Sequence, residues 1–349
     1  MSDHKTFTQA INEALHEVMN ADERVICYGL GTDDPKRIFG TTQQLQERFG
    51  TERVFDMPTA ENAMTGVAVG AAIGGLRPVM VHQRLDFFLL AFDQLINSAA
   101  KWHFMFGGQQ SIPITIRLIM GRGWGQGPTH SQNLHALFAH IPGLKVVLPT
   151  TPHDAKGLLI DSILDDDPVL FLEHRWLHNQ KGFVPSGFYR KPIGYSEIMK
   201  EGADLTIVSL SYMTVEAIRA IPILEKSGIS VEHIDLKCAN PIDWPCILSS
   251  VEKTGRLLVL DTGVLTGSVA GEIIAKAATE VFHALKCAPQ RITLPDIPTP
   301  TSFGLTKDFY PGAEDIVRCA GTMLGKDIPY DFRNERPHDV PGDWFTGPF

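Results

Sequence analysis

The chain has 349 residues, of which 44% are hydrophobic and 20% charged, and its net charge is −9. This length suits about two domains with large cores, and the acidic balance argues against a nucleic-acid partner. The five cysteines are widely spread and include no C-x-x-C pair, which favours reduced thiols in a cytoplasmic protein. No apolar run is long enough to cross a bilayer, so no membrane association is expected.

Strand-like and helix-like segments alternate along the first half of the chain. Continuous apolar runs predict strands at 25–30, 77–82, 112–119, 144–149 and 168–174. Helices are predicted at 61–75, 89–106 and 152–165. Buried strands separated by helices are typical of an open parallel α/β sheet with right-handed crossovers. The pattern therefore predicts a first α/β domain over residues 1–190.

The same alternation restarts after a looser stretch containing Pro and Gly, and we place a linker there at 191–204. Further strands are expected at 205–210, 230–236, 256–262 and 291–296, with helices at 213–227, 242–253, 267–285 and 312–324. They predict a second, smaller α/β domain over 205–326, so the fold class is α/β with two doubly wound domains. The tail, 327–349, ends in aromatic residues that we expect to pack on the body or on a partner subunit.

Glu61 is the first candidate functional residue. It lies in FDMPTAENAMTGVAVGAAIGGL, in the first turn of the helix expected at 61–75. A helix N-terminus attracts negative charge, so the carboxylate can be purely structural, or it can serve catalysis. Gly66, Gly70 and Gly74 recur every four residues and leave one face of this helix bare, which favours close packing of a neighbouring helix.

Phe87 and His130 are the other candidates. Phe87 stands beside Phe88, and such aromatics usually belong to the core, although a ring can also stack on a planar ligand. His130 lies in the glycine-rich loop GRGWGQGPTHSQ, 121–132, which follows a predicted strand. Loops at the carboxyl ends of strands hold the sites of open α/β sheets. His130 can cap the next helix or act as an acid, a base or an oxyanion donor, and the loop lacks both glycine-rich phosphate-binding patterns.

Residues 5–325 resemble the β subunits of thiamine-diphosphate-dependent 2-oxoacid dehydrogenases, the E1 components. The resemblance is carried by PTAENAMTGVAVGAAIGGLRPV, DFFLLAFDQLINSAAK, THSQNLHALFAHIPGLKVVLPTTPHDAKGLL and DDDPVLFLEH. It implies an N-terminal pyrimidine-binding domain and a C-terminal domain, both of the transketolase type. It also implies an α2β2 heterotetramer with an E1 α subunit.

The resemblance assigns roles to individual residues. It implies that Glu61 binds the pyrimidine of thiamine diphosphate, that Phe87 stacks on it, and that His130 is the active-site histidine. The protein then supplies polarisation and orientation, while the cofactor supplies the reactive carbon. The resemblance also implies a potassium site at Ile114, Ser162, Asp165 and Asp167. The GDG segment that holds the diphosphate and Mg²⁺ in this superfamily is missing from the sequence, so we expect the α subunit to complete the site.

Several segments depart from the family pattern. In DLKCANPID, 235–243, Lys237 and Asn240 replace two arginines, which are not equivalent at bidentate sites, so docking of the α subunit or of a lipoyl acyltransferase core can differ. RLDFFLL, GRGWGQG and EHRWLH also differ from typical pyruvate and branched-chain subunits.

The main hypothesis is decarboxylation of a 2-oxo acid with acyl transfer to lipoamide. The alternative is the pyrimidine-binding subunit of a split transketolase-like enzyme that transfers a ketol unit in a biosynthetic pathway. A non-catalytic scaffold subunit is a third hypothesis. A nicotinamide-binding Rossmann protein is disfavoured, because G-x-G-x-x-G does not follow the first predicted strand.

Overall fold

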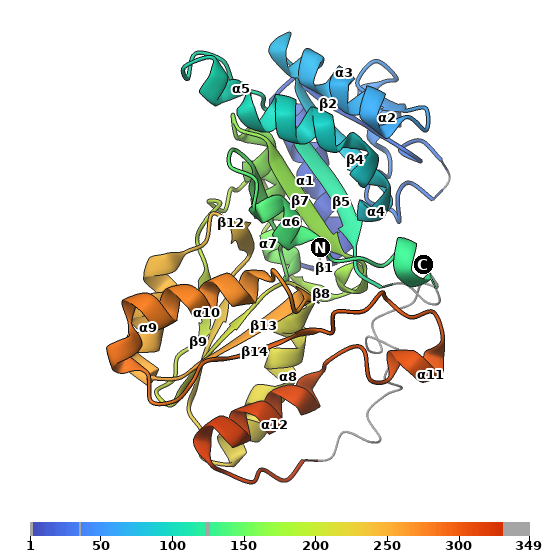
Figure 1. Cartoon of the computed structure of the whole chain (residues 1–349). Coiled ribbons are helices and arrows are strands. Elements are labelled where there is room, and N and C mark those ends of the chain that lie inside the picture. Colours follow the sequence, from blue (N-terminus) through green and yellow to red (C-terminus); the bar gives the residue numbers. More distant parts are fainter. Residues whose placement is uncertain (1–2, 35, 123–125, 331–349) are drawn as a thin grey trace.

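Two α/β units lie one above the other in the computed structural model (Figure 1), which describes residues 3–34, 36–122 and 126–330. The upper unit is built on a sheet of seven strands and the lower on a sheet of five, and helices cover both faces of each. Within these residues, no helix is both long enough and apolar enough to cross a membrane.

The seven-stranded sheet is parallel except at one edge, where β12 is antiparallel to β6. In sheet order its strands are β12 (Cys238–Asn240), β6 (Lys145–Val147), β7 (Val169–His174), β5 (Thr115–Met120), β4 (Arg77–His82), β2 (Val25–Gly29) and β3 (Val54–Asp56). A separate antiparallel pair joins β1 (His4–Thr6) to β8 (Lys181–Phe183). The helical segments of this unit are α1 (Phe7–Ala21), α2 (Leu45–Phe49), α3 (Glu61–Ile73), α4 (Leu85–Phe88), η1 (Leu89–Ala91), η2 (Gln94–Ala99), α5 (Ala100–Met105), η3 (Gly127–Thr129), α6 (His135–Ala139), α7 (Pro152–Leu164) and η4 (Arg175–Leu177).

The five-stranded sheet is parallel apart from β9, which runs antiparallel to β11 at one edge. In sheet order its strands are β14 (Gln290–Leu294), β13 (Leu257–Val264), β10 (Leu205–Ser209), β11 (Val231–Asp235) and β9 (Glu197–Lys200). Its helical segments are α8 (Tyr212–Lys226), α9 (Trp244–Thr254), α10 (Val269–Glu280), η5 (Phe282–Ala284), α11 (Phe303–Thr306) and α12 (Ala313–Leu324).

Helix α1 shows how the sequence produces these layers. Its buried residues include Phe7, Ile11, Leu15 and Val18, and this spacing of three to four places them on one face of the helix. Thr6 begins the helix with a capping box. Its hydroxyl accepts from the backbone N–H of Gln9, and its own backbone N–H donates to the Gln9 side-chain oxygen. The apolar face packs beside α7 on the first sheet.

The prediction of two doubly wound α/β units is confirmed, and each predicted strand has a counterpart within a few residues. The helix predicted at 89–106 is instead a 3-10 turn, a π-helical segment and a short α-helix in succession. The segment expected to be a linker, 191–204, contains β9. The tail from residue 331 lies outside the described residues.

The two units share one core. After β11 the chain crosses to the first sheet, where β12 pairs with β6 and places Cys238 opposite Val147. A single cluster of buried side chains runs from Phe88 and Leu118 in the first unit to Leu236 and Ile273 in the second. The carboxyl ends of the strands of both sheets therefore sit in a fixed arrangement around the region between them.

Candidate active site

Glu61 is the first residue of α3 and is only 5% exposed. The turn before it is held by Asp56, whose carboxylate accepts from the backbone of Gly31 and Met57, both at 2.9 Å. The residue that caps α3, Ala60, has no side-chain hydrogen bond to offer. Among the described residues, no side chain donates to the Glu61 carboxyl, so this buried acid is available to a ligand or partner group.

Phe87 and His130 meet in the structure. Their ring centroids are 5.2 Å apart and their planes are nearly perpendicular. Both rings are half-buried, whereas Phe88 is fully buried against His82. Of the two neighbouring aromatics, Phe88 thus belongs to the core and Phe87 remains accessible.

The loop after β4 is joined to the loop after β5 by side chains on both sides of this ring pair. Arg84 donates to the Gln126 side chain, and Gln132 donates to the Asp86 carboxylate at 2.8 Å. Arg84 is 3% exposed, and its burial lowers its pKa to about 10. These contacts fix His130 beside Phe87.

Sequence analysis missed Arg84, Asp86, Gln126 and Gln132. The available signal was that Arg84 and Asp86 closely follow the strand predicted at 77–82, and that Gln126 and Gln132 lie in the glycine-rich loop after the strand predicted at 112–119. Pairing between the two loops is a tertiary contact that no local pattern encodes.

Glu61, Phe87 and His130 follow the carboxyl ends of β3, β4 and β5. These strands belong to one parallel sheet, and its chain order reverses around β2, which pairs with β3 on one side and β4 on the other. Such reversal points are where open α/β sheets bind ligands. The carboxyl of Glu61 makes no direct bond to the two rings, although α3 and α4 are in contact.

The four residues of the expected potassium site lie together at the end of α7. The carbonyl of Ile114 accepts from the Val169 backbone at 3.0 Å, and that of Ser162 accepts from the Thr115 hydroxyl at 3.0 Å. Lys145 contacts Asp165 at 2.7 Å and Asp167 at 3.1 Å. Burial alone would lower the pKa of Lys145, but hydrogen bonds to the two carboxylates raise it overall. Protein donors thus already occupy much of this oxygen set, and the potassium site stays a prediction that unfolding in KCl against NaCl would test.

The bare face of α3 points away from the other residues that the structure describes. Among those residues, a side chain at Gly70 would meet no atom within 4 Å, and one at Gly66 would meet only the Gln94 side chain at 3.8 Å. Val67 and Ile73 on the same face are exposed. The expected close packing against a neighbouring helix therefore does not occur within the described part of this chain.

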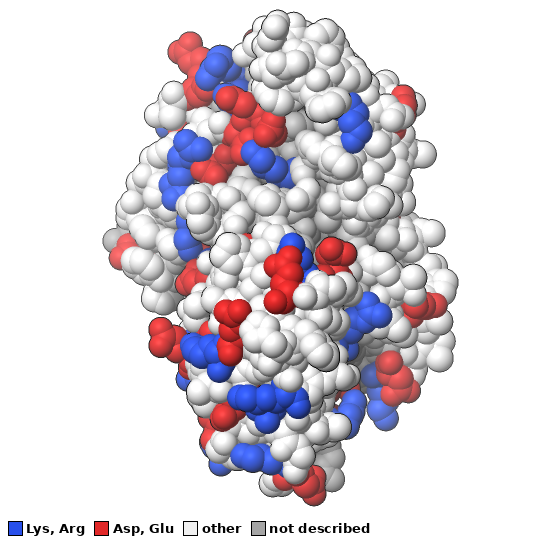
Figure 2. All heavy atoms as spheres, turned by 60° about the vertical axis from the view of Figure 1, so that its left-hand side comes forward, with Lys and Arg blue, Asp and Glu red and all other residues white. Residues whose placement is uncertain are grey.

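Apolar side chains are also exposed near the end of α5. Phe104 is 87% exposed and Leu90, on η1, is 70% exposed. The upper right of the face in Figure 2 is mostly free of charged side chains, whereas both signs of charge are mixed over the rest. Exposed apolar surface of this kind marks sites of protein association.

Family models agree with this architecture. Residues 3–180 match the model described as "Transketolase, pyrimidine binding domain", and residues 194–316 match "Transketolase, C-terminal domain". A solved structure titled "Split gene transketolase, inactive beta4 tetramer" aligns with a TM-score of 0.73 at 22% identity, covering 91% of this chain and 98% of that one. The fold therefore places the chain among two-domain proteins of the transketolase class.

Relatives with known names point to one family within this class. The chain is 41% identical over 327 residues to the acetoin:2,6-dichlorophenolindophenol oxidoreductase subunit beta of Cupriavidus necator, covering 90% of this chain and 96% of that protein. It is 40% identical over 300 residues to the pyruvate dehydrogenase E1 component subunit beta of Acholeplasma laidlawii, covering 86% and 92%. The chain belongs to the family of E1 β subunits of thiamine-diphosphate-dependent 2-oxoacid dehydrogenases.

Proposed function

We propose that this chain is the β subunit of an E1 component that decarboxylates a 2-oxo acid and transfers the acyl group to lipoamide. In this proposal it provides the pyrimidine-binding half of each active site. The single observation that carries the proposal is the buried Glu61 carboxyl, which has no donor in the described part of the chain and lies at the strand edge where Phe87 and His130 are in contact.

The residues present fit the pyrimidine end of thiamine diphosphate. A flat aminopyrimidine needs an apolar face and a carboxyl group for a ring nitrogen, and Phe87 and Glu61 offer these groups. Bound cofactor supplies the carbon nucleophile and accepts the electrons released when carbon dioxide leaves. Mg²⁺ and the diphosphate are assigned to the partner chain, because the sequence has no GDG segment.

Each of the three residues has a distinct role in this proposal. Glu61 would hydrogen-bond a ring nitrogen of the pyrimidine through its carboxyl, and Phe87 would orient the ring by stacking. The Nδ1 of His130 lies 2.9 Å from the Thr129 hydroxyl, which leaves Nε2 to bind the charge that develops on the substrate oxygen. A positioned acid or base of this kind contributes about 100-fold or more in rate.

An E1 α subunit is the partner that the family implies, and we propose an α2β2 assembly in the cytoplasm. The bare face of α3 and the exposed apolar end of α5 support association. The smooth α3 face, which begins one turn after Glu61, suits close approach of a partner helix to the cofactor. Because the proposed reaction transfers the acyl group to lipoamide, we also propose a lipoyl acyltransferase core as a second partner.

Reconstitution with a GDG-bearing α chain tests the function. The complex is expected to decarboxylate a 2-oxo acid and acylate lipoamide, whereas the chain alone is expected to be inactive and to bind thiamine diphosphate weakly. Pyruvate and acetoin belong in the substrate panel, because relatives named for both match similarly. Ketol transfer to a sugar acceptor without lipoamide acylation would favour a split transketolase. Tight binding of the cofactor by the lone chain in calorimetry would contradict the shared site.

A further inference from the structure

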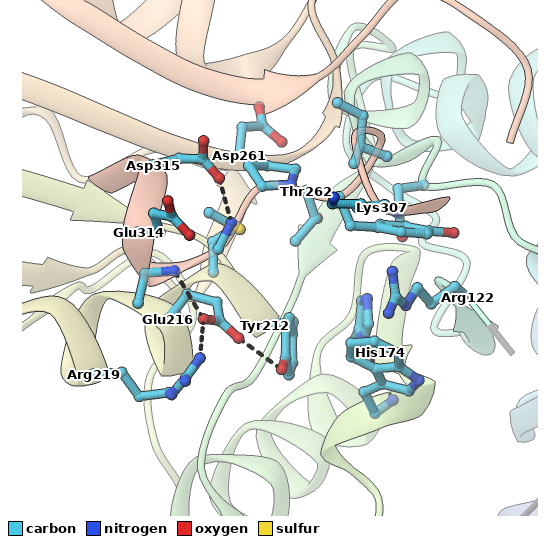
Figure 3. A pocket seen from close by; sticks show the side chains of 18 residues that line it. Arg122, His174, Tyr212, Glu216, Arg219, Asp261, Thr262, Lys307, Glu314 and Asp315 are labelled. Atoms are coloured by element: carbon cyan, nitrogen blue, oxygen red, sulfur yellow. Dashed lines mark hydrogen bonds and ion pairs between the residues drawn. The ribbon is translucent and has the colours of Figure 1, made fainter. Parts of the chain in front are cut away.

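The segment 126–135, which carries His130, borders the second unit as well as the candidate active site. Asn133 of this segment lines a cavity of about 220 Å³ that residues of both units enclose. Figure 3 shows Arg122 of the first unit and Asp261 of the second on the wall of this cavity. Contacts that the second unit makes with this segment therefore bear on where His130 lies.

A buried pair of side chains joins the end of this segment to the second unit. His135 begins α6 and Asp261 lies in β13, and both side chains are fully buried. The ring Nε2 of His135 donates to the Asp261 carboxylate at 2.7 Å. The other ring nitrogen has no hydrogen-bond partner among the described residues, so the bond to Asp261 is the polar contact that orients the ring there. Hydrogen bonds to an ionised group in the protein interior are among the strong ones.

Asp261 is itself held in place by the second unit. Its carboxylate also accepts from the backbone of Gly263 at 2.8 Å and from that of Ala270, in the first turn of α10, at 3.0 Å. Burial alone would raise the pKa of Asp261, but His135 and these N–H groups lower it overall, so the group is ionised at neutral pH. A side chain at Gly263 would lie only 3.1 Å from the His135 ring, so a glycine there permits the close approach of the two units.

Two further contacts hold the same segment nearer to His130. The Gln132 side chain donates to Asp86 of the first unit at 2.8 Å. A side chain at Gly127 would lie 2.5 Å from the hydroxyl oxygen of Thr301, so the second unit also reaches the segment just before His130. The position of His130 between these contacts therefore depends on both units.

We infer that Asp261 and His135 are positioning residues, through which the second unit holds His130 beside Phe87. His135 follows His130 in one short segment, so a shift at the start of α6 moves the imidazole of His130. The second unit thereby takes part in catalysis, although the candidate site residues all lie in the first unit. The inference rests on the proposed function for the role of His130, whereas the placement of the segment can be measured without turnover.

Kinetics of the reconstituted complex test the catalytic consequence. His135→Leu should lower kcat about 10- to 100-fold with little change in KM, because small misplacements of a catalytic group have effects of this size. His135→Gln should restore most of the rate, since its amide nitrogen can still donate to Asp261. His140→Leu, at an exposed histidine directly after α6, is the matched control and should keep the wild-type kcat.

A double variant separates positioning from general damage to the fold. In a His130→Asn background, His135→Leu should lower kcat no further, because the effects of residues that act through one group are not additive. The same loss of kcat in both backgrounds would overturn the inference. Wild-type kcat in His135→Leu alone would overturn it as well.

Hydrogen exchange of the full-length chain without its partner tests the placement of the segment. The backbone N–H groups of His130 and Gln132 each have an acceptor, and both should exchange about tenfold faster in His135→Leu but at the wild-type rate in His140→Leu. If His135→Leu does not fold, Asp261→Asn replaces it in both measurements. Unchanged exchange would overturn the inference. An inactive wild-type complex combined with the expected exchange would instead count against the proposed function, while supporting the placement of His130 by the second unit.

Discussion

Glu61→Ala is expected to abolish activity without destabilising the protein. The carboxyl is buried and has no donor among the described residues, and such a group costs about 1–3 kcal/mol. Because Glu61 lies in the first turn of α3, the helix dipole stabilises its carboxylate by about 0.3–1 kcal/mol. The lone variant chain should therefore be as stable as the wild type, or more stable by on the order of 1 kcal/mol. Turnover of the reconstituted complex should fall by about 100-fold or more.

Two measurements made side by side separate these effects: urea unfolding of the lone chain, and 2-oxo acid decarboxylation by the complex with a GDG-bearing α chain. Glu272→Ala is the matched control, because Glu272 also lies in the first turn of a helix, α10, but is exposed. That control should lose about 0.3–1 kcal/mol of stability and keep full turnover. Wild-type turnover in Glu61→Ala would refute the proposed role. A loss of more than about 2 kcal/mol would show that the carboxyl is structural.

The remaining predictions concern the partner face, a buried acid and the ring pair. Gly70→Leu should leave the stability of the lone chain unchanged or raised by about 0.5–1 kcal/mol, because the site is open and glycine is a poor helix former. It should nevertheless block association with the α chain in gel filtration, while Thr279→Leu on exposed α10 should not. Burial, with a contribution from nearby Asp154, raises the pKa of Asp235 from 3.8 to about 7, so the folded chain keeps a proton that the unfolded chain loses. The free energy of unfolding should therefore fall by up to about 4 kcal/mol as pH rises from about 4 to about 7. Asp235→Asn should be free of this pH dependence when both proteins are unfolded in urea across the same pH range. His130→Asn should lower kcat, whereas Phe87→Leu should mainly weaken cofactor affinity, and reversed effects would contradict the assigned roles.

The layers of the fold could be predicted because a buried parallel strand shows in the local sequence as a short apolar run, as in VICYGL and RPVMVH. The order of strands and the exchange of β12 into the first sheet could not, since they depend on pairing between residues far apart, such as Cys238 and Val147. The helix predicted at 89–106 has a helical composition throughout, and only packing changes its hydrogen-bond register to a π-helical one.

The candidate site was partly predictable for the same reason. Phe87 and His130 each follow a strand that the sequence reveals, so their approach to one sheet edge follows from parallel topology. Their edge-to-face contact depends on Arg84–Gln126 and Asp86–Gln132, which are tertiary contacts. The openness of the α3 glycine face also required the structure, because spacing alone cannot say whether a neighbour covers it.

Three of the segments that depart from the family pattern, RLDFFLL, GRGWGQG and EHRWLH, meet in space. Arg84 of RLDFFLL bonds to Gln126 of GRGWGQG, and Arg122 of the same loop stacks on Trp176 of EHRWLH. These contacts lie at the carboxyl ends of β4, β5 and β7, beside Phe87 and His130, and not on the outer helices. These three segments therefore differ from the family pattern in loops beside the candidate site, whereas DLKCANPID differs at β12, the far edge of the same sheet.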